Sequence, residues 1–402
     1  MGNAFRRPVS KWRGFLIGGV RHIRSEKQMK SLLVTIIGFV LTSLAATGVP
    51  QPLASPAALA QAECDCSKLE TMQIELRNAL RLQQAFRNKI PELREMNRPT
   101  SQNALQVFAK GEARRGFEPI PDYKGPAEVD YYPFGRGLHA DTDLSNRKDD
   151  LCRRDATSES ALKEAKEKSA CVGIGAATQA HEDFHANFCR RVGFVPYEAM
   201  HGADRAQEEV EAYGAQIAVL RAEIAKVLEH TNVRIEFESE VRAQWPPNPA
   251  ITAEIIEVHS EVSMDRVSAS GDMIKLEGQG TQTNNARLEG HCSFTGGLPY
   301  TLTSRGTLET DGLEAQIRLT SEGTSPSLKA QCTIEGQTGR GWTMPVNLNS
   351  GGNVPVINMP LKNRAEKVFD QSTGEGAKIV AQAGVKLSGQ AKIRLILCEQ
   401  SK

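Results

Sequence analysis

The sequence predicts an α+β protein, with a mainly helical domain over residues 61–240 and an antiparallel β-sandwich or barrel-like domain over residues 250–402. Two observations support this division. Apolar residues recur at helical spacing in long segments before residue 240, whereas short segments of alternating polar and apolar residues follow it. Between the two patterns, Pro246, Pro247 and Pro249 indicate a linker.

Residues 1–60 have the features of a cleaved secretory signal peptide. Residues 1–30 hold eight Lys/Arg and one acidic residue, an uncharged apolar run follows from Ser31 to Val49, and Ala58-Leu59-Ala60 is a small-x-small cleavage site. Met29 is an alternative translation start. The apolar run is almost long enough to span a bilayer, so an uncleaved anchor is the rival interpretation. We expect a secreted or periplasmic protein without stable membrane insertion after cleavage.

The charge of the predicted mature chain argues against nucleic acid as a partner. The whole chain has 49 Lys/Arg and 48 Asp/Glu, so loss of residues 1–60 leaves 41 and 47 and a net charge near −6. A mildly acidic surface does not attract polyanions or anionic membranes. The remaining length, about 340 residues, exceeds one ordinary hydrophobic core, and this predicts two domains.

An even number of cysteines in an exported chain predicts disulfides. Five of the eight precede residue 240 and three follow it, so full pairing requires an odd number of bridges across that boundary. Two of them, Cys64 and Cys66, are too close in sequence to pair readily with each other. The eight are Cys64, Cys66, Cys152, Cys171, Cys189, Cys292, Cys332 and Cys398.

Four segments before residue 240 have a helical pattern: Ser67 to about Met96 with an interruption at Pro91, Ser158 to about Ala170, Ala176 to Arg191, and a long helix that begins after Asp204. Residues 97–150 are rich in Gly, Pro, Asp and Tyr, which is typical of an ordered loop or lid. Whether residues 61–150 form a pro-segment is left open. Beyond the linker, six segments alternate as half-buried strands do: 266–280, 300–310, 314–323, 327–336, 377–384 and 391–398.

The segment from His181 to His185 reads H-E-x-x-H and lies in one predicted helix. Residues four apart project from the same helix face, so His181 and His185 can bind one Zn²⁺. Glu182 is then placed to take a proton from a metal-bound water. The alternatives are histidines that only pack or cap, and a structural or inert metal.

A catalytic zinc usually has three protein ligands and one open position. The helix after Asp204 contains Glu208, Glu209 and Glu211. On a helical wheel Glu209 lies at the edge of the apolar stripe, whereas the other two point towards solvent. A carboxylate on the buried side costs free energy unless it is paired or binds a metal. We therefore expect Glu209 to be the third ligand, with Glu211 in reserve.

H-E-x-x-H followed 24 residues later by E-x-x-A-Y resembles the gluzincin class of zinc metallopeptidases, over about residues 175–225. The resemblance implies a zincin-like catalytic domain in which His181, His185 and Glu209 bind zinc and Glu182 is the general base. It also places Tyr213 one turn after the third ligand.

One departure from the gluzincin pattern is Asp183, because these enzymes usually keep that position uncharged. The oxyanion formed during hydrolysis needs a donor besides zinc, and Tyr213, Tyr197 and His201 are the candidates. Tyr213 is the second catalytic candidate after Glu182, with ordinary core packing as its alternative. For Cys189, one turn after His185, a disulfide is favoured over a bond to the metal.

Together these patterns predict an exported zinc-dependent metallopeptidase that hydrolyses peptide or protein substrates. A secreted toxin that cleaves a host or competitor protein is a related hypothesis with the same chemistry. The alternative is a non-catalytic cell-envelope binding or adhesion protein that uses the C-terminal β-domain. The sequence identifies neither the substrate nor the oligomeric state.

Overall fold

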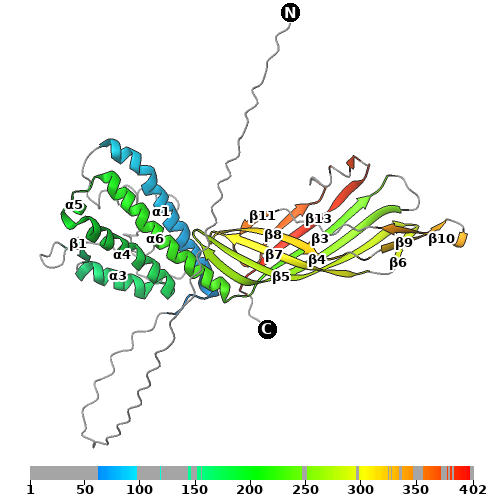
Figure 1. The fold of residues 1–402 in the computed structure, drawn as a ribbon, viewed down its shortest axis with the longest axis horizontal. Helices are drawn as coiled ribbons and strands as arrows, with labels where there is room; N and C mark the ends of the chain where they lie inside the picture. Colours follow the sequence, from blue (N-terminus) through cyan, green and yellow to red (C-terminus); the bar gives the residue numbers. More distant parts are fainter. Residues whose placement is uncertain are drawn as a thin grey trace, which may run out of the picture. The chain divides into compact units, whose positions relative to one another are not determined.

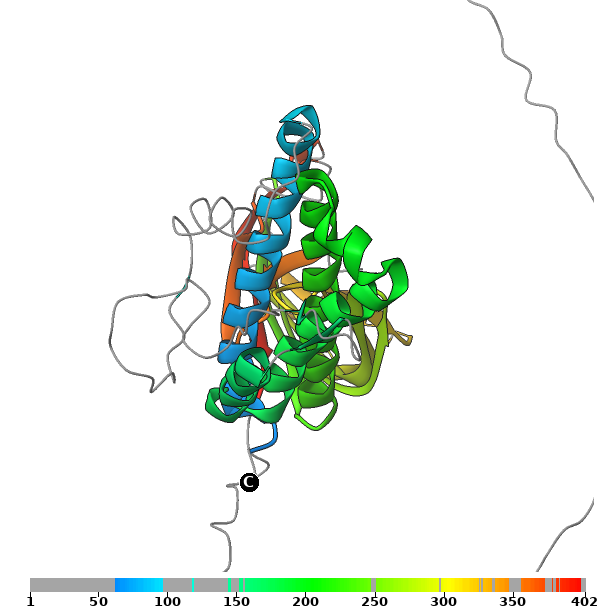
Figure 2. The same cartoon turned by 90° about the vertical axis from the view of Figure 1, so that its left-hand side faces the viewer.

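In the computed structural model, the two longest described helices are α1 (Leu69–Met96) and α6 (Gly202–Glu229). They lie side by side (Figure 1, Figure 2). Helix α1 buries apolar residues three or four positions apart, among them Met72, Leu76 and Leu82. The ring of Phe86 stacks on Tyr213 of α6, with centroids 5.9 Å apart. The predicted interruption at Pro91 is wrong, because α1 continues through it to Met96.

The structure describes residues 62–96, 118, 144–145, 152–154, 156–246, 251–295, 298–324, 326, 328–334, 337–346, 356–372, 378, 381–382 and 384–398. The predicted signal peptide lies outside these residues, as does almost all of the predicted loop or lid over 97–150. No helix in the described ranges is both long and apolar enough to cross a membrane.

The described residues also form three shorter helices: α3 (Ala156–Lys168), α4 (Val172–Val192) and α5 (Phe194–Glu198). The one-turn η1 (Cys66–Lys68) precedes α1. Gly193 ends α4 with a φ of 92°, a conformation that favours glycine, and its N–H donates to the carbonyl of Cys189. This turn brings α5 back beside the end of α4, while α4 itself packs against α6.

The described strands beyond residue 232 form mainly one eight-stranded antiparallel sheet in the order β11-β8-β7-β5-β4-β3-β13-β12. The coarse prediction of an α+β protein with an antiparallel β part is therefore confirmed. The strands are β3 (Val233–Gln244), β4 (Ile251–Ser270), β5 (Met273–Gly290), β7 (Tyr300–Thr310), β8 (Glu314–Glu322), β11 (Ile357–Pro360), β12 (Ala365–Asp370) and β13 (Lys386–Ile396).

The sheet is curled. Strands β11 and β12 lie at opposite ends of the strand order, yet only residues 361–364 separate them in the chain. The two edges are therefore brought towards each other. Alternating side chains of β7, from Tyr300 to Thr310, are buried on one face, as a half-buried strand requires.

Three details of the sequence prediction need correction. The segment 266–280, predicted as one strand, is the end of β4, a turn at Gly271 and Asp272, and the start of β5. The sheet begins at Val233, inside the residues 61–240 assigned to the helical domain, because the alternating segment Val233–Gln244 is β3 and pairs with β4 and β13. In the predicted strand 377–384, the described residues Lys378 and Ala381 are helical. That segment contains three alanines, and alanine favours helices most strongly.

A second sheet has three strands in the order β10-β9-β6: β6 (Cys292–Thr295), β9 (Leu328–Ile334) and β10 (Gln337–Val346). Cys292 lies directly opposite Cys332 in the β6–β9 register, and the two form a disulfide. The short strands β1 (Leu144–Ser145) and β2 (Arg153–Arg154) pair with each other near the helices.

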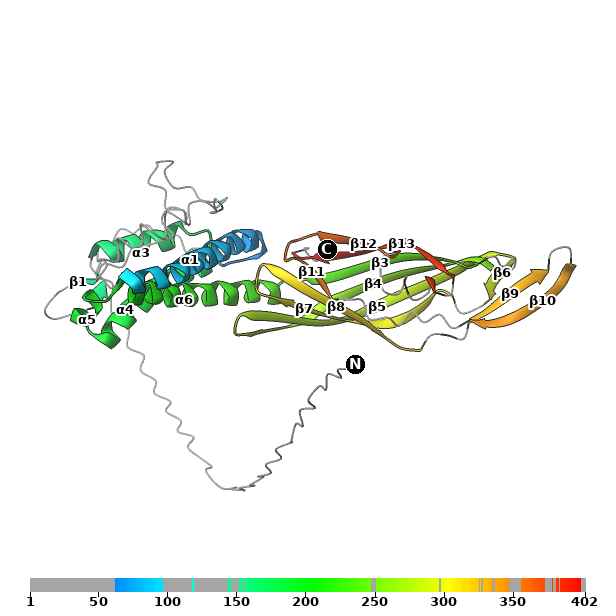
Figure 3. The same cartoon turned by 90° about the horizontal axis from the view of Figure 1, so that it is seen from above.

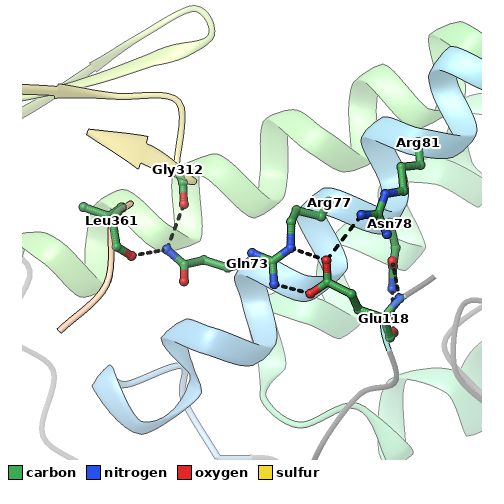
Figure 4. Close-up of polar contacts among 7 residues, drawn as sticks. All are labelled: Gln73, Arg77, Asn78, Arg81, Glu118, Gly312 and Leu361. Carbon is green, nitrogen blue, oxygen red and sulfur yellow. Dashed lines mark hydrogen bonds and ion pairs between the residues drawn. The ribbon is translucent and has the colours of Figure 1, made fainter. Parts of the chain in front are cut away.

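The helices and the main sheet share one hydrophobic core and belong to one compact unit, residues 59–402. At their junction, buried Gln73 of α1 donates to the carbonyls of Gly312 (3.0 Å) and Leu361 (2.7 Å) (Figure 4). Gly312 has a φ of 99°, and a Cβ there would lie 2.9 Å from Leu76. Figure 3 shows α6 reaching one end of the sheet, where Arg221 donates to the carbonyl of Asp311.

A clamp on α1 fixes one residue of the segment between α1 and β1. Glu118 accepts two hydrogen bonds from Arg77, at 2.8 and 2.5 Å, and its backbone exchanges two more with the Asn78 side chain (Figure 4). The hydrogen bond from Arg77 lowers the pKa of Glu118.

All eight cysteines are paired, and the parity argument is confirmed. A single bridge, Cys66–Cys398, crosses residue 240, whereas Cys64–Cys171 and Cys152–Cys189 lie before it and Cys292–Cys332 after it. Cys64 and Cys66 do not pair with each other. Four disulfides are typical of a chain that folds in an oxidising compartment outside the cytosol.

Buried Glu75 of α1 makes the stability of the fold depend on pH. Its side chain is buried, one carboxyl oxygen has no hydrogen-bond partner in the part of the chain that the structure describes, and burial raises the pKa well above the usual 4.5. An acid with a raised pKa in the folded state costs no stability below pH 4.5, and stability falls as the pH rises towards the raised value. Glu75→Gln should therefore raise the midpoint of thermal unfolding by a few degrees at pH 8 and by less at pH 4.5. The control is Glu70→Gln, an exposed position on the same helix; equal gains at both pH values would contradict the prediction.

Candidate metal centre

Helix α4 carries both histidines of the H-E-x-x-H segment on its buried face. Its buried positions include Ala177, His181 and His185, which recur every four residues and face α6. Glu182 is also buried, whereas Asp183 is half exposed. The folding of α4 therefore brings the two imidazoles and one carboxylate of the motif into the interior.

Glu209 of α6 completes a group of three ligands. The Nε2 atoms of His181 and His185 are 3.2 Å apart, and the Oε2 atom of Glu209 lies 3.7 Å from the first and 3.6 Å from the second. All three side chains are buried, and together they could hold a metal ion. Glu211, the reserve candidate, is exposed and accepts a hydrogen bond from Gln207.

The spacing of these three atoms matches a small tetrahedral ion. Zinc bonds to His nitrogen and carboxylate oxygen are about 2.0–2.2 Å long, so neighbouring ligand atoms in a tetrahedral site lie roughly 3.3–3.5 Å apart. The observed separations of 3.2, 3.6 and 3.7 Å are close to that edge length. Three ligands occupy one face of such a tetrahedron and leave the fourth position open.

Glu208 is buried, contrary to the sequence prediction that it faces solvent. Its side chain is 2 % exposed, and its Oε1 atom is 2.9 Å from Nδ1 of His185. Because Oε1 accepts the proton of Nδ1, the lone pair of His185 is directed from Nε2 towards His181 and Glu209. The wheel prediction failed because α6 contacts α1 on one side and α4 on the other, so its buried arc is wider than one apolar stripe.

The site attracts positive charge. Burial disfavours the charged imidazolium of His185, but the negative charge of Glu209 and the hydrogen bond to Glu208 outweigh this and raise its pKa well above the usual value. The same field favours a cation at the point where the three ligand atoms converge.

Arg205 and Tyr197 lie behind Glu208. The guanidinium of Arg205 stacks on the Tyr197 ring at 4.1 Å, donates to the Tyr197 carbonyl at 2.5 Å and pairs with Glu208 at 3.9 Å. Burial and the charge of Glu208 raise the pKa of the Tyr197 phenol, which keeps it protonated. Sequence reasoning identified Tyr197 only as a candidate oxyanion donor and missed Arg205.

The remaining predicted residues are placed as follows. Tyr213 packs its ring edge-on against His181, with centroids 4.4 Å apart. His201 is exposed at the start of α6. Cys189 is in the disulfide with Cys152 rather than beside the metal ligands.

The charge of Asp183, which departs from the gluzincin pattern, is compensated locally. Its Oδ1 atom accepts two hydrogen bonds from Arg154 of β2, at 2.9 and 2.8 Å. Arg154 also donates to Glu159. Asp183 therefore projects away from the three ligands and anchors the β2 segment to α4.

Comparison with known proteins adds no assignment. No protein-family model, no curated protein and no solved structure matches this chain.

Proposed function

We propose that the protein is an exported zinc-dependent metallopeptidase, with zinc held by His181, His185 and Glu209. The observation that carries the proposal is the triangle of ligand atoms with edges of 3.2, 3.6 and 3.7 Å. Two imidazoles and one carboxylate, with one open position, form the ligand set of catalytic rather than structural zinc sites.

The residues around the triangle have the chemistry that hydrolysis requires. When bound, zinc supplies Lewis acidity: it lowers the pKa of a water molecule and polarises a peptide carbonyl. Glu182, beside the first ligand on α4, takes the proton of the attacking water and passes it to the leaving amine. Glu208 holds His185 in the tautomer that ligates through Nε2.

Burial of these groups also supports a functional role. Glu182, Glu208 and Glu209 are all less than 5 % exposed. Three buried carboxylates within one small region destabilise a fold unless cations or hydrogen bonds compensate them. A dication between the histidines and Glu209, together with Arg205 beside Glu208, supplies that compensation.

The ring of Tyr213 has a supporting role in this proposal. Its contact with His181 restricts the orientation of that candidate ligand, and Phe86 of α1 stacks on the Tyr213 ring. Its hydroxyl remains a candidate donor to the oxyanion.

The test is zinc content together with hydrolysis. The purified chain should hold about one zinc per molecule and cleave members of a mixed peptide library, as detected by mass spectrometry. A chelator should remove the activity, and added zinc should restore it. His181→Ala should hold almost no zinc, whereas His259→Ala, at an exposed histidine of β4, should match the native chain. A native chain that takes up no zinc would make the binding or adhesion role of the β part the better hypothesis.

A further inference from the structure

Arg205 is buried beside the candidate metal centre without touching it. It lies on α6 one turn before Glu208, and its side chain is 4 % exposed. A guanidinium is almost never buried without a partner, because it cannot give up its charge. Its contacts should therefore show why the fold keeps it there.

Those contacts lead in two directions. A hydrogen bond from Nη2 to the Tyr197 carbonyl at 2.5 Å, the stacking on the Tyr197 ring and an ion pair with half-exposed Glu198 at 3.8 Å hold α5 against α6. The Nη1 atom faces the Oε2 atom of Glu208 at 3.9 Å, while the other oxygen of the same carboxylate accepts from His185. Buried Nε and Nη1 have no hydrogen-bond partner among the described residues, so the guanidinium has unused donors next to Glu208.

The charges explain why this arrangement matters for the metal. Glu208 and Glu209 are adjacent, buried and both directed at His185. Without Arg205, the hydrogen bond from His185 would be the remaining compensation for the buried charge of Glu208, beside a second buried carboxylate, and Glu208 would hold its position against His185 less firmly. Arg205 faces the oxygen of Glu208 that does not accept from His185.

We propose that Arg205 is a positioning residue for the metal centre: it compensates the charge of Glu208 and so keeps that carboxylate hydrogen-bonded to His185. The inference rests on the proposed zinc site, although it does not depend on the chemistry that the site performs. The candidate ligand His185 and its hydrogen-bond partner Glu208 form the first two layers around the metal site. Arg205, which pairs with Glu208, adds a third.

A double-mutant cycle in zinc affinity tests the proposal, with Kd measured by competition against a chelator. Arg205→Met should weaken zinc binding by about 100-fold, the upper end for residues outside the ligand set. Glu208→Gln keeps an oxygen that accepts from His185, and should weaken binding by about 10-fold. Removing both charges should restore affinity to about the level of Glu208→Gln alone, because no uncompensated carboxylate remains.

A merely structural role gives a different result. If Arg205 only holds α5 through Tyr197, the double variant should be at least as weak as Arg205→Met, because Glu208→Gln repairs none of those contacts. Arg205→Lys separates the roles again, since lysine keeps the charge but loses the stacking and the planar donors; it should bind zinc within about threefold of the native chain. If Arg205→Met does not fold, Glu208→Gln is compared with the double variant, and equal affinities support the proposal.

The outcomes distinguish this inference from the proposed function. Coupling between Arg205 and Glu208 in a chain that binds zinc but cleaves no peptide would support the positioning role and contradict the peptidase. Additive effects in a chain that does cleave peptides would overturn the positioning role alone. Native affinity in Arg205→Met would also overturn it.

Discussion

Replacing Glu182 with glutamine is expected to reduce peptide hydrolysis by about 10²–10⁴-fold while leaving zinc bound. Glu182 is buried on α4 and lies between His181 and His185 in the sequence. It is not one of the three candidate metal ligands. Glutamine has almost the same shape but cannot accept a proton. The rate should therefore fall without loss of the metal, as measured by kcat on a cleaved peptide and by zinc content of the same sample.

The neighbouring residue provides a matched control. Asp183→Asn also removes one negative charge from the motif, but Asp183 faces Arg154 and solvent rather than the ligands. It should change hydrolysis by less than about tenfold, because surface ion pairs contribute little. If Glu182→Gln loses zinc and activity in parallel, Glu182 supports the ligands and is not the general base.

The three candidate ligands could be predicted from the sequence because their placement depends on the geometry of single helices. The spacing of His181 and His185 is a property of α4 alone, and the position of Glu209 relative to the apolar stripe is a property of α6 alone. The structure brings these three residues together as the periodicity predicted. Zinc as the metal, and peptide hydrolysis as the reaction, remain predictions.

The surrounding layer could not be predicted, because it depends on how helices pack against one another. Glu208 lies on what a helical wheel shows as the solvent side of α6, and the packing of α4 against α6 buries it. Arg205 is buried where it contacts Tyr197 of α5. A sequence signal existed in retrospect: Arg205, Glu208 and Glu209 fall at i, i+3 and i+4, so one helix face carries three charges.

The sheet shows the same limit. Alternation identified β7, β8, β9 and the end of β13, but it missed β3, β11 and β12. The strand order is non-local, and a proline-rich segment predicted to be a domain linker instead lies within the connection between β3 and β4. Prolines mark the end of a strand without indicating whether the next strand pairs with it. Disulfide parity was informative because counting needs no geometry, although it could not identify the partners.

The third ligand can be tested by comparing two glutamates of α6. Glu209→Gln should weaken zinc binding by more than about 100-fold, beyond the effect of residues outside the ligand set, because the neutral amide is a poor zinc ligand and leaves the dication with two imidazoles only. Glu211→Gln, two residues away and exposed, removes the same charge from the same helix and should bind zinc as the native chain does. Both affinities are measured by chelator competition, with helical content checked by circular dichroism.

The comparison separates ligation from the general field of the helix. If long-range charge alone attracted the cation, both variants would weaken binding by a similar and small factor, since exposed charges are screened within about 10 Å at ordinary ionic strength. A loss confined to Glu209→Gln requires direct contact with the ion. Because Glu209 lies 3.6–3.7 Å from both Nε2 atoms, that contact would place the metal between α4 and α6.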